Sequence, residues 1–375
     1  MNVQEVIHRS LLVTAGLLIG VVAAEAMART YAHFGGEMGR QLARQDPLNV
    51  IIEPHGEWGY RQRPNLVHEY PNGARATSNA MGFRGPVVAV PKPPRVFRVI
   101  LLGGSTTFGF QVEDDETIDA HMRHLLSERY PTTRFEVVNL ALDGYDSYQI
   151  YQRLKSDGVA LSPDLVILNT GINDVRNARY PDLKIPDPRT VVWAGNLEQL
   201  HDQAQRGGPS LRLRLGHYSY AIRLLTLIRG NLSRRAELAL NSTVVAHPEA
   251  VDYFETNVRR AAELVEQAGA GLILSTPPSS LRTKYAPDAV SDQSYWIVNA
   301  ATTQEYRDRL AARLQRLASE ATARGWPATY LHLDLAPEFF QDDCHLTSDG
   351  NREVAKGFVN ALHPFMERAL QKPAL

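Results

Sequence analysis

Short apolar runs alternate with amphipathic helical patterns from residue 95 onward, and no other feature constrains the fold of this chain as strongly. Each run is long enough for a buried strand and too short for a helix. The five runs are Val96–Leu102, Phe135–Leu140, Leu165–Leu168, Leu272–Ser275 and Tyr330–Leu335. Strands separated by helices require right-handed crossovers, which produce a mostly parallel sheet with helices on both faces. The sequence therefore predicts an α/β fold.

Composition limits the classes of function that this fold can serve. The 375 residues include 40 Lys and Arg against 41 Asp and Glu, which gives a formal net charge of −1. A nucleic-acid binder needs a positive excess or a basic stripe, so nucleic acid is not an expected partner. The single cysteine, Cys344, excludes an intrachain disulfide and a cysteine-rich metal site.

Residues 1–30 are predicted to be a signal-anchor or a signal peptide. An apolar run, Leu11–Ala24, lies close to the N-terminus, as in export signals. Small-x-small sites around Ala26 suit cleavage and secretion. Glu25 and Arg29, four apart on a helix, suit an uncleaved anchor whose end reaches the membrane interface. We expect a membrane anchor, with secretion after cleavage as the alternative, and the rest of the chain in the periplasm or outside the cell.

Three segments follow from these patterns. Residues 1–30 form the export segment, residues 31–94 an N-terminal extension, and residues 95–375 the main domain. The extension is rich in turn formers and aromatic residues, so we expect it to be ordered and to wrap the main domain. Residues 179–242 break the alternation of strands and helices, which predicts a partly helical insertion in the main domain.

Residues that suit acyl transfer follow four of the predicted strands. Ligands of an open α/β sheet bind at the carboxyl ends of its strands, so the loops at that edge are the first place to look for a site. These loops contain a serine, a glycine, an asparagine and an aspartate–histidine pair, namely Ser105, Gly144, Asn173, Asp342 and His345. We expect these groups to meet at one edge of the sheet.

Each of these residues has a predicted chemical role. A serine hydroxyl is a weak nucleophile at neutral pH, so Ser105 needs a base, which His345 provides while Asp342 orients the imidazole. The tetrahedral oxyanion that forms during acyl transfer needs preorganised donors. The candidates are the backbone N–H groups of Ser105 and Gly144 and the side-chain amide of Asn173. Glycine at position 144 lets the backbone approach a substrate without a Cβ atom.

The same loops resemble the conserved blocks of the SGNH hydrolases, the GDSL-type esterases and lipases. Ser105 matches the block I serine, Gly144 the block II glycine, Asn173 the block III asparagine, and Asp342-x-x-His345 block V. The resemblance covers roughly residues 95–370. It implies a flavodoxin-like three-layer α/β/α sandwich with a central parallel five-stranded sheet, hydrolysis of carboxylic esters, and no metal or other cofactor.

Two blocks depart from the pattern of the family. Gly104 stands where the name-giving aspartate of block I usually is, and Thr106 stands in place of leucine. In block II, Ala141 replaces a frequent glycine. Many members vary at these positions, so the prediction of the nucleophile is retained. Upstream, Asn79–Gly85 resembles a segment that precedes block I in membrane-anchored bacterial members.

Neighbouring residues offer alternatives to this assignment. Asp343 is an alternative partner for His345, although the spacing and the family favour Asp342. Cys344 is expected to pack, because adjacent residues on an extended turn point apart. His121 and His124 are three apart on a predicted helix. No third ligand accompanies them in the sequence, so a solvated helix face is expected rather than a metal site.

The resemblance predicts a serine esterase that hydrolyses esters through an acyl-enzyme. The expected substrate is an acylated small molecule or polysaccharide, with small acyl groups such as acetyl on a carbohydrate or cell-envelope polymer. One alternative is an O-acyltransferase, in which a sugar hydroxyl replaces water. Another is a non-catalytic scaffold of the cell envelope, although such a scaffold has no need of the Asp342–His345 pair.

Overall fold

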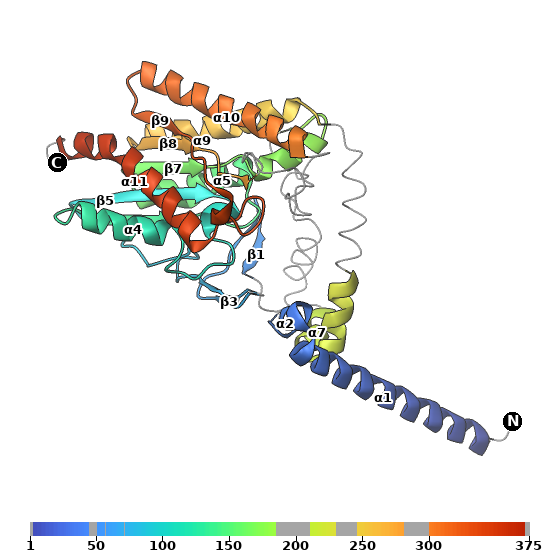
Figure 1. The fold of residues 1–375 in the computed structure, drawn as a ribbon. Coiled ribbons are helices and arrows are strands. Elements are labelled where there is room, and N and C mark those ends of the chain that lie inside the picture. The colour runs from blue at the N-terminus through green and yellow to red at the C-terminus, as the bar shows by residue number, and fades with distance from the viewer. Residues whose placement is uncertain are drawn as a thin grey trace. The chain divides into compact units, whose positions relative to one another are not determined.

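A parallel sheet forms the centre of the larger of two compact units (Figure 1). The computed structural model describes residues 3–44, 51–56, 58–70, 72–184, 211–229, 246–280 and 300–371. Among these residues, five strands pair in parallel: β5 (Val96–Gly103), β6 (Arg134–Asn139), β7 (Leu165–Asn169), β8 (Gly271–Ser275) and β9 (Ala328–Leu331). The predicted five-stranded parallel sheet is confirmed.

The order of the strands across the sheet is β6-β5-β7-β8-β9. The chain begins the sheet at β5, adds β6 on one side, and then crosses over to add β7 on the other side. This is the flavodoxin-like order, in which ligands bind where the winding reverses, at the carboxyl ends of the first and third strands. The register pairs Gly103 of β5 with Asn169 of β7, so both strands end at the same edge.

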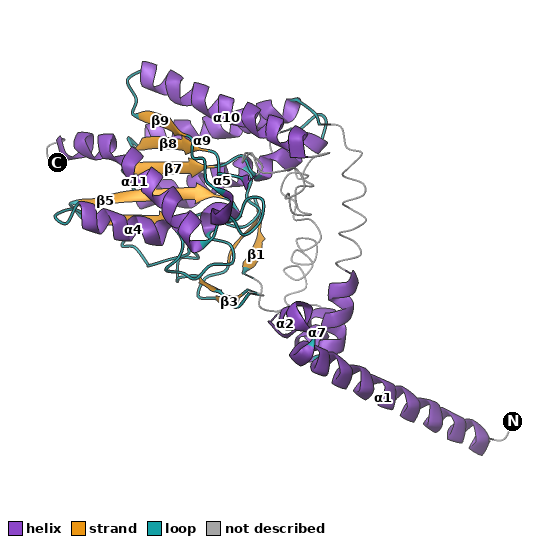
Figure 2. Ribbon diagram, viewed as in Figure 1, coloured by secondary structure: helices purple, strands orange, loops and turns teal. Residues whose placement is uncertain are grey.

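Helices cover both faces of the sheet (Figure 2). The helices α4 (Ile118–Arg129) and α11 (Ser348–Gln371) pack together and share an apolar core with residues of β5, β6, β7 and β8. A second group of helices packs together and contacts β8 and β9: α5 (Ser147–Arg153), α9 (Glu249–Gln267) and α10 (Ala300–Ala323). Every residue of β5 is buried, which is typical of a strand between two layers of helices.

Short elements join these helices and strands. They are α3 (Ser105–Phe108), η1 (Leu154–Gly158), η2 (Val159–Leu161), η3 (Asn173–Arg179) and η6 (Pro337–Phe339).

The last strand is shorter than predicted. The strand predicted to reach Leu335 ends at Leu331. Leu333 and Leu335 still pack against the core. Their apolar spacing indicated burial, and an extended loop provides burial without strand pairing.

The smaller compact unit contains α1 (Val3–Phe34), α2 (Gly36–Arg44) and α7 (Leu211–Tyr218). By length and composition, α1 can cross a membrane, as an anchor or as a signal sequence. Within this unit, the Glu25 carboxylate accepts hydrogen bonds from the Ser219 hydroxyl (2.8 Å) and from the backbone N–H groups of Tyr220 and Ala221 (both 3.1 Å). Glu25 therefore caps the helical segment that begins at Tyr220.

The segment of the chain between α2 and β5 contains four short strands: β1 (Ile52–His55), β2 (Gly59–Gln62), β3 (Val67–Glu69) and β4 (Arg75–Thr77). β1 and β2 form an antiparallel hairpin in the larger unit. The division into an extension at 31–94 and a main domain at 95–375 stays a prediction. Most of the predicted insertion at 179–242 lies outside the described residues.

The buried side chain of Arg84 holds the loop that follows α3. Its guanidinium donates hydrogen bonds to the backbone carbonyls of Phe108, Gly109 and Val112. It also pairs with the Asp114 carboxylate over 2.8 Å. Since α3 begins at Ser105, this arginine stabilises the backbone directly after the predicted nucleophile.

Replacing Arg84 with Met should lower the free energy of unfolding by about 3–5 kcal/mol, because it leaves several buried carbonyls without donors. Urea denaturation of the variant measures the change. Arg134→Met is the matched control, since the Arg134 side chain is 68% exposed and its replacement should cost little. A loss below about 1 kcal/mol in Arg84→Met would contradict the prediction.

Candidate active site

The Ser105 hydroxyl, the His345 imidazole and the Asp342 carboxylate form a continuous line of hydrogen bonds. Ser105 is the first residue of α3, directly after β5, and its Oγ lies 2.8 Å from Nε2 of His345. Nδ1 of His345 lies 2.7 Å from Oδ2 of Asp342. The fold thus brings a serine and a histidine 240 positions apart in the sequence into direct contact.

Further hydrogen bonds fix the loop that carries Asp342 and His345. Oδ1 of Asp342 accepts from the backbone N–H groups of Cys344 (2.9 Å) and His345 (2.7 Å). The Thr106 hydroxyl donates to the Cys344 carbonyl over 3.1 Å. Thr106 stands where leucine is usual in block I, and here it connects the loop of the base directly to the helix of the serine.

Burial and hydrogen bonding act against each other on both charged groups. Burial raises the pKa of Asp342, but hydrogen bonds from His345 and from two backbone N–H groups outweigh it, so this pKa lies below its ordinary value. Burial lowers the pKa of His345, but interactions with Cys344 and the Asp342 carboxylate outweigh it, so this pKa lies well above its ordinary value. Asp342 is therefore a carboxylate that stabilises protonated His345.

Gly144 and Asn173 both lie close to the serine loop. Gly144 has a φ of 80°, a conformation that favours glycine, and its N–H has no acceptor among the described residues. Nδ2 of Asn173 donates to the Tyr145 carbonyl over 2.9 Å, which leaves its second hydrogen available. A Cβ atom at position 104 would overlap this Nδ2. Glycine in place of the usual aspartate therefore lets Asn173 approach the loop of Ser105.

The sequence did not indicate two residues that contact or adjoin Gly144. Arg176 follows Asn173 by three positions in η3 and donates from Nη2 to the Gly144 carbonyl over 3.0 Å. Burial raises the pKa of the Asp143 carboxyl to about 6, although the charges of His345 and Arg84 lower it. Oδ1 of Asp143 is buried and has no hydrogen-bond partner in the described part of the chain. In the sequence, the only indication of a role for Arg176 or Asp143 was that each lies close to a residue of a family block.

The contacts favour Asp342 over Asp343 as the partner of the imidazole. His345 hydrogen-bonds to the Asp342 carboxylate, whereas burial raises the pKa of Asp343. Cys344 is fully buried, and burial raises the pKa of its thiol. Its Sγ lies 3.9 Å from Nδ1 of His345, so the prediction that these adjacent side chains point apart is wrong.

Possible metal-ligating atoms of Asp342, Cys344 and His345 lie within 4.8 Å of one another. A metal ion held by these atoms would have to displace the hydrogen bond that joins Nδ1 of the imidazole to the Asp342 carboxylate. The thiolate form that a metal needs is also disfavoured, because burial raises the pKa of the thiol. The chemistry of these donors therefore fits proton transfer better than metal binding.

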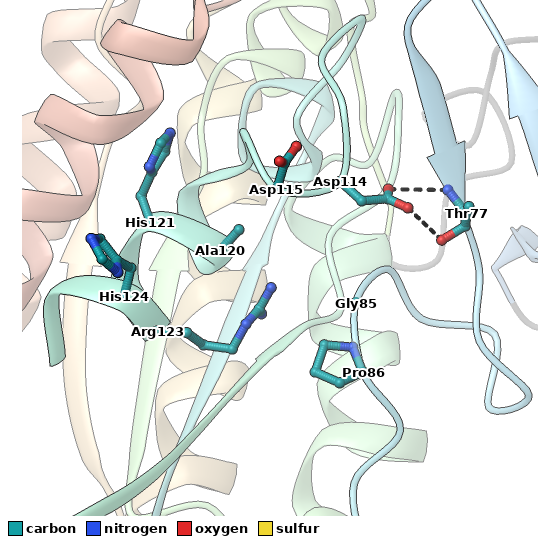
Figure 3. Close-up of a pocket in the computed structure, with 9 residues that line it drawn as sticks. All are labelled: Thr77, Gly85, Pro86, Asp114, Asp115, Ala120, His121, Arg123 and His124. Carbon is teal, nitrogen blue, oxygen red and sulfur yellow. Dashed lines mark hydrogen bonds between the residues drawn. The ribbon is translucent and has the colours of Figure 1, made fainter. Parts of the chain in front are cut away.

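A separate polar cavity of about 590 Å³ lies beside α4 (Figure 3). Its lining comprises Thr77, Gly85, Pro86, Asp114, Asp115, Ala120, His121, Arg123 and His124, and none of the predicted site residues. The His124 side chain is 71% exposed and lies 3.3 Å from Glu128, as expected for a solvated face. His121 is half-buried instead, and burial lowers its pKa.

Residues 101–353 match the model of the GDSL-like lipase/acylhydrolase family. The match spans more than half of the chain and includes the whole hydrogen-bonded line from Ser105 to Asp342. The chain belongs to the GDSL-like lipase/acylhydrolase family. This family member is an ester hydrolase, and its substrate carries an acyl group. No curated protein sequence matches it significantly.

Solved structures of hydrolases resemble this family member at low sequence identity. A catalytic mutant of an acetylxylan esterase from Geobacillus stearothermophilus is 15% identical, with a TM-score of 0.41 over 71% of this chain and 94% of that one. A GDSL-like lipase from Bacteroides thetaiotaomicron is 16% identical, with a TM-score of 0.37 over 71% of this chain and 88% of that one. The family match, rather than these similarities, carries the assignment.

The imidazole of His345 should titrate above its ordinary pKa of about 6.5. In Asp342→Asn this pKa should fall, because an amide does not stabilise the imidazolium by charge. Since the folded pKa is raised, protonation of His345 stabilises the fold below about pH 6.5, and this contribution is lost as the pH rises through the folded pKa.

An NMR titration of the imidazole resonances, assigned with His345→Gln, measures this pKa. The matched control is Asp349→Asn, which removes an exposed carboxylate paired with Arg352 and should leave the titration of His345 unchanged. Equal His345 pKa values in the wild type and in Asp342→Asn would show that the carboxylate does not set the pKa.

Proposed function

We propose that this hydrolase is a serine esterase that works through an acyl-enzyme. Ser105 is the nucleophile, His345 the general base and then the general acid, and Asp342 the residue that orients the imidazole. The unbroken line of hydrogen bonds, 2.8 Å from Ser105 Oγ to His345 and 2.7 Å from His345 to Asp342, carries this proposal. The Asp342 carboxylate stabilises the imidazolium that forms when His345 takes the proton.

In the first half of the reaction, Oγ of Ser105 forms a bond to the ester carbonyl carbon while its proton passes to Nε2 of His345. The carbonyl electron pair moves to oxygen, and the N–H groups of Ser105 and Gly144 and the Asn173 amide stabilise the oxyanion. The intermediate then collapses, and the leaving alkoxide takes the proton from His345. Water repeats the sequence on the acyl-enzyme and releases the carboxylic acid.

We propose small acyl groups, acetyl above all, on a carbohydrate or cell-envelope polymer as the substrate. The support is the match of residues 101–353 to a family of lipases and acylhydrolases, whose substrates carry acyl groups.

The full-length protein in detergent should react with a fluorophosphonate probe and hydrolyse p-nitrophenyl acetate. Ser105→Ala should abolish labelling, because the probe bonds to the nucleophile, and both Ser105→Ala and His345→Ala should lower kcat by at least about 10³-fold. Ser127→Ala is the matched control, since Ser127 is an exposed serine on α4, and it should retain both activities.

If labelling persists in Ser105→Ala, or if the wild type is not labelled, Ser105 is not the nucleophile. The product separates hydrolysis from transfer. Incubation with an acetylated oligosaccharide should release free acetate, whereas acetyl groups that appear on an added sugar acceptor would identify an O-acyltransferase.

We also propose that α1 stays in the mature protein as a membrane anchor, with the catalytic domain in the periplasm or outside the cell. The contacts of Glu25 support retention. Cleavage after Ala26 or Ala28 would remove the carboxylate that accepts from Ser219, Tyr220 and Ala221. The helical segment that follows Ser219 would then lose its cap.

The full-length protein should stay in the membrane fraction after an alkaline carbonate wash, and intact-mass measurement should find residues 1–28 still attached. The control is a variant that lacks residues 1–28 and is exported by a cleavable signal peptide. This variant should be absent from the membrane fraction. A mature protein that begins at Met27 or Arg29 would show instead that the segment is a signal peptide.

A further inference from the structure

We infer that Tyr60, in the β1–β2 hairpin, is a positioning residue of the oxyanion site, because its hydroxyl fixes the peptide that carries the Gly144 N–H. The inference rests on the proposed function, since it concerns the same oxyanion. The Tyr60 hydroxyl donates to the Asp143 carbonyl over 2.7 Å. Tyr60 lies outside the residues that match the family, so a group from the upstream chain contributes to the site.

Three consecutive carbonyl groups beside the nucleophile are each held by a donor from another part of the chain. Residues 143–145 lie in neither a helix nor a strand, and the only backbone–backbone hydrogen bond across them within the described chain closes a turn, from the Tyr145 N–H to the Leu142 carbonyl over 3.2 Å. The donor–acceptor pairs are Tyr60 Oη to Asp143, Arg176 Nη2 to Gly144 and Asn173 Nδ2 to Tyr145. These side chains therefore add to the single turn hydrogen bond the restraint that secondary structure gives elsewhere.

The Asp143 carbonyl and the Gly144 N–H belong to one peptide unit. In a planar trans peptide these two groups point in opposite directions. A donor that holds the carbonyl oxygen on one side therefore sets the direction of the N–H on the other side. The restraint matters most at glycine, which has access to a wider range of backbone angles than other residues.

A compact network holds Tyr60 in place. Trp58 Nε1 donates to the Tyr145 hydroxyl over 3.1 Å, and that hydroxyl donates to the Tyr60 carbonyl over 2.9 Å. Gln149 Nε2, in α5, donates to the Trp58 carbonyl over 3.1 Å. The rings of Tyr60 and Tyr145 lie 5.3 Å apart. The hairpin and the loop at 143–145 are thus joined by backbone, hydroxyl and ring contacts.

The Tyr60 hydroxyl remains a donor throughout the neutral pH range. The side chain is 1% exposed, and burial raises its pKa well above the ordinary value, against the charge of Arg176, which lowers it. The hydroxyl therefore keeps its proton at neutral pH and cannot act as a base there. Its role is to orient and polarise a backbone N–H that stabilises the oxyanion.

This role has a kinetic signature. The oxyanion forms only on the way to the tetrahedral intermediate, so a misdirected Gly144 N–H weakens the transition state and not the bound ester. Loss of a whole oxyanion donor costs about 10²–10³-fold in kcat, and a misaligned donor retains part of its effect. We therefore expect Tyr60→Phe to lower kcat about tenfold and to leave KM within about twofold.

The experiment compares full-length variants with p-nitrophenyl acetate, after titration of active sites with the fluorophosphonate probe so that only folded sites are counted. Tyr60→Phe keeps the ring and removes the donor. Substituting 4-aminophenylalanine at position 60 keeps the ring and restores an N–H donor at the same point, so it should recover most of the lost kcat. Tyr130→Phe is the matched control, because it removes the same hydroxyl from a tyrosine that bonds to His363 and to none of residues 143–145.

Tyr130→Phe should retain the wild-type kcat. The inference is overturned if Tyr60→Phe turns over at the wild-type rate, if 4-aminophenylalanine is as slow as phenylalanine, or if Tyr130→Phe loses kcat as Tyr60→Phe does. Failure of the proposed function has a different outcome, since the wild type would then show no labelling that depends on Ser105.

Discussion

The shared register of the parallel strands β5 and β7 is the constraint on which the rest of the structure depends. Gly103 pairs with Asn169, so the chain leaves both strands at one edge of the sheet, with Ser105 on one side and Asn173 on the other. Every residue of β5 and β7 is buried. A slip by one residue would turn each side chain toward the opposite core, so burial keeps the two site loops at the same level.

Above this edge, side-chain donors orient backbone that has no regular structure. Arg84 binds the carbonyls that follow α3, Thr106 binds the Cys344 carbonyl, and Tyr60 binds the Asp143 carbonyl. A buried carbonyl must find a donor, and each donor here also fixes a loop that carries a site residue. The same bonds that satisfy the interior thus preorganise the groups of the reaction.

The pKa values of two acids of the site shift in opposite directions because their hydrogen-bond donors differ. Burial raises the pKa of both carboxyl groups. Asp342 has donors on both oxygens, including the imidazole, and these bring its pKa below the ordinary value. Asp143 has a buried oxygen with no donor in the described chain, and its pKa rises to about 6. The different donors therefore keep Asp342 ionised and leave Asp143 with a raised pKa.

The sequence by itself determined the parallel sheet and the candidate residues Ser105, Gly144, Asn173, Asp342 and His345, because apolar periodicity and short loop motifs are local. It did not determine where the last strand ends, since Leu333 and Leu335 satisfy the same apolar pattern in a loop. Only the tertiary structure decided that Tyr60 and Arg176 hold the carbonyls beside Gly144. A hydrogen bond between residues 83 positions apart leaves no periodic trace in a sequence, because it depends on how separate segments pack.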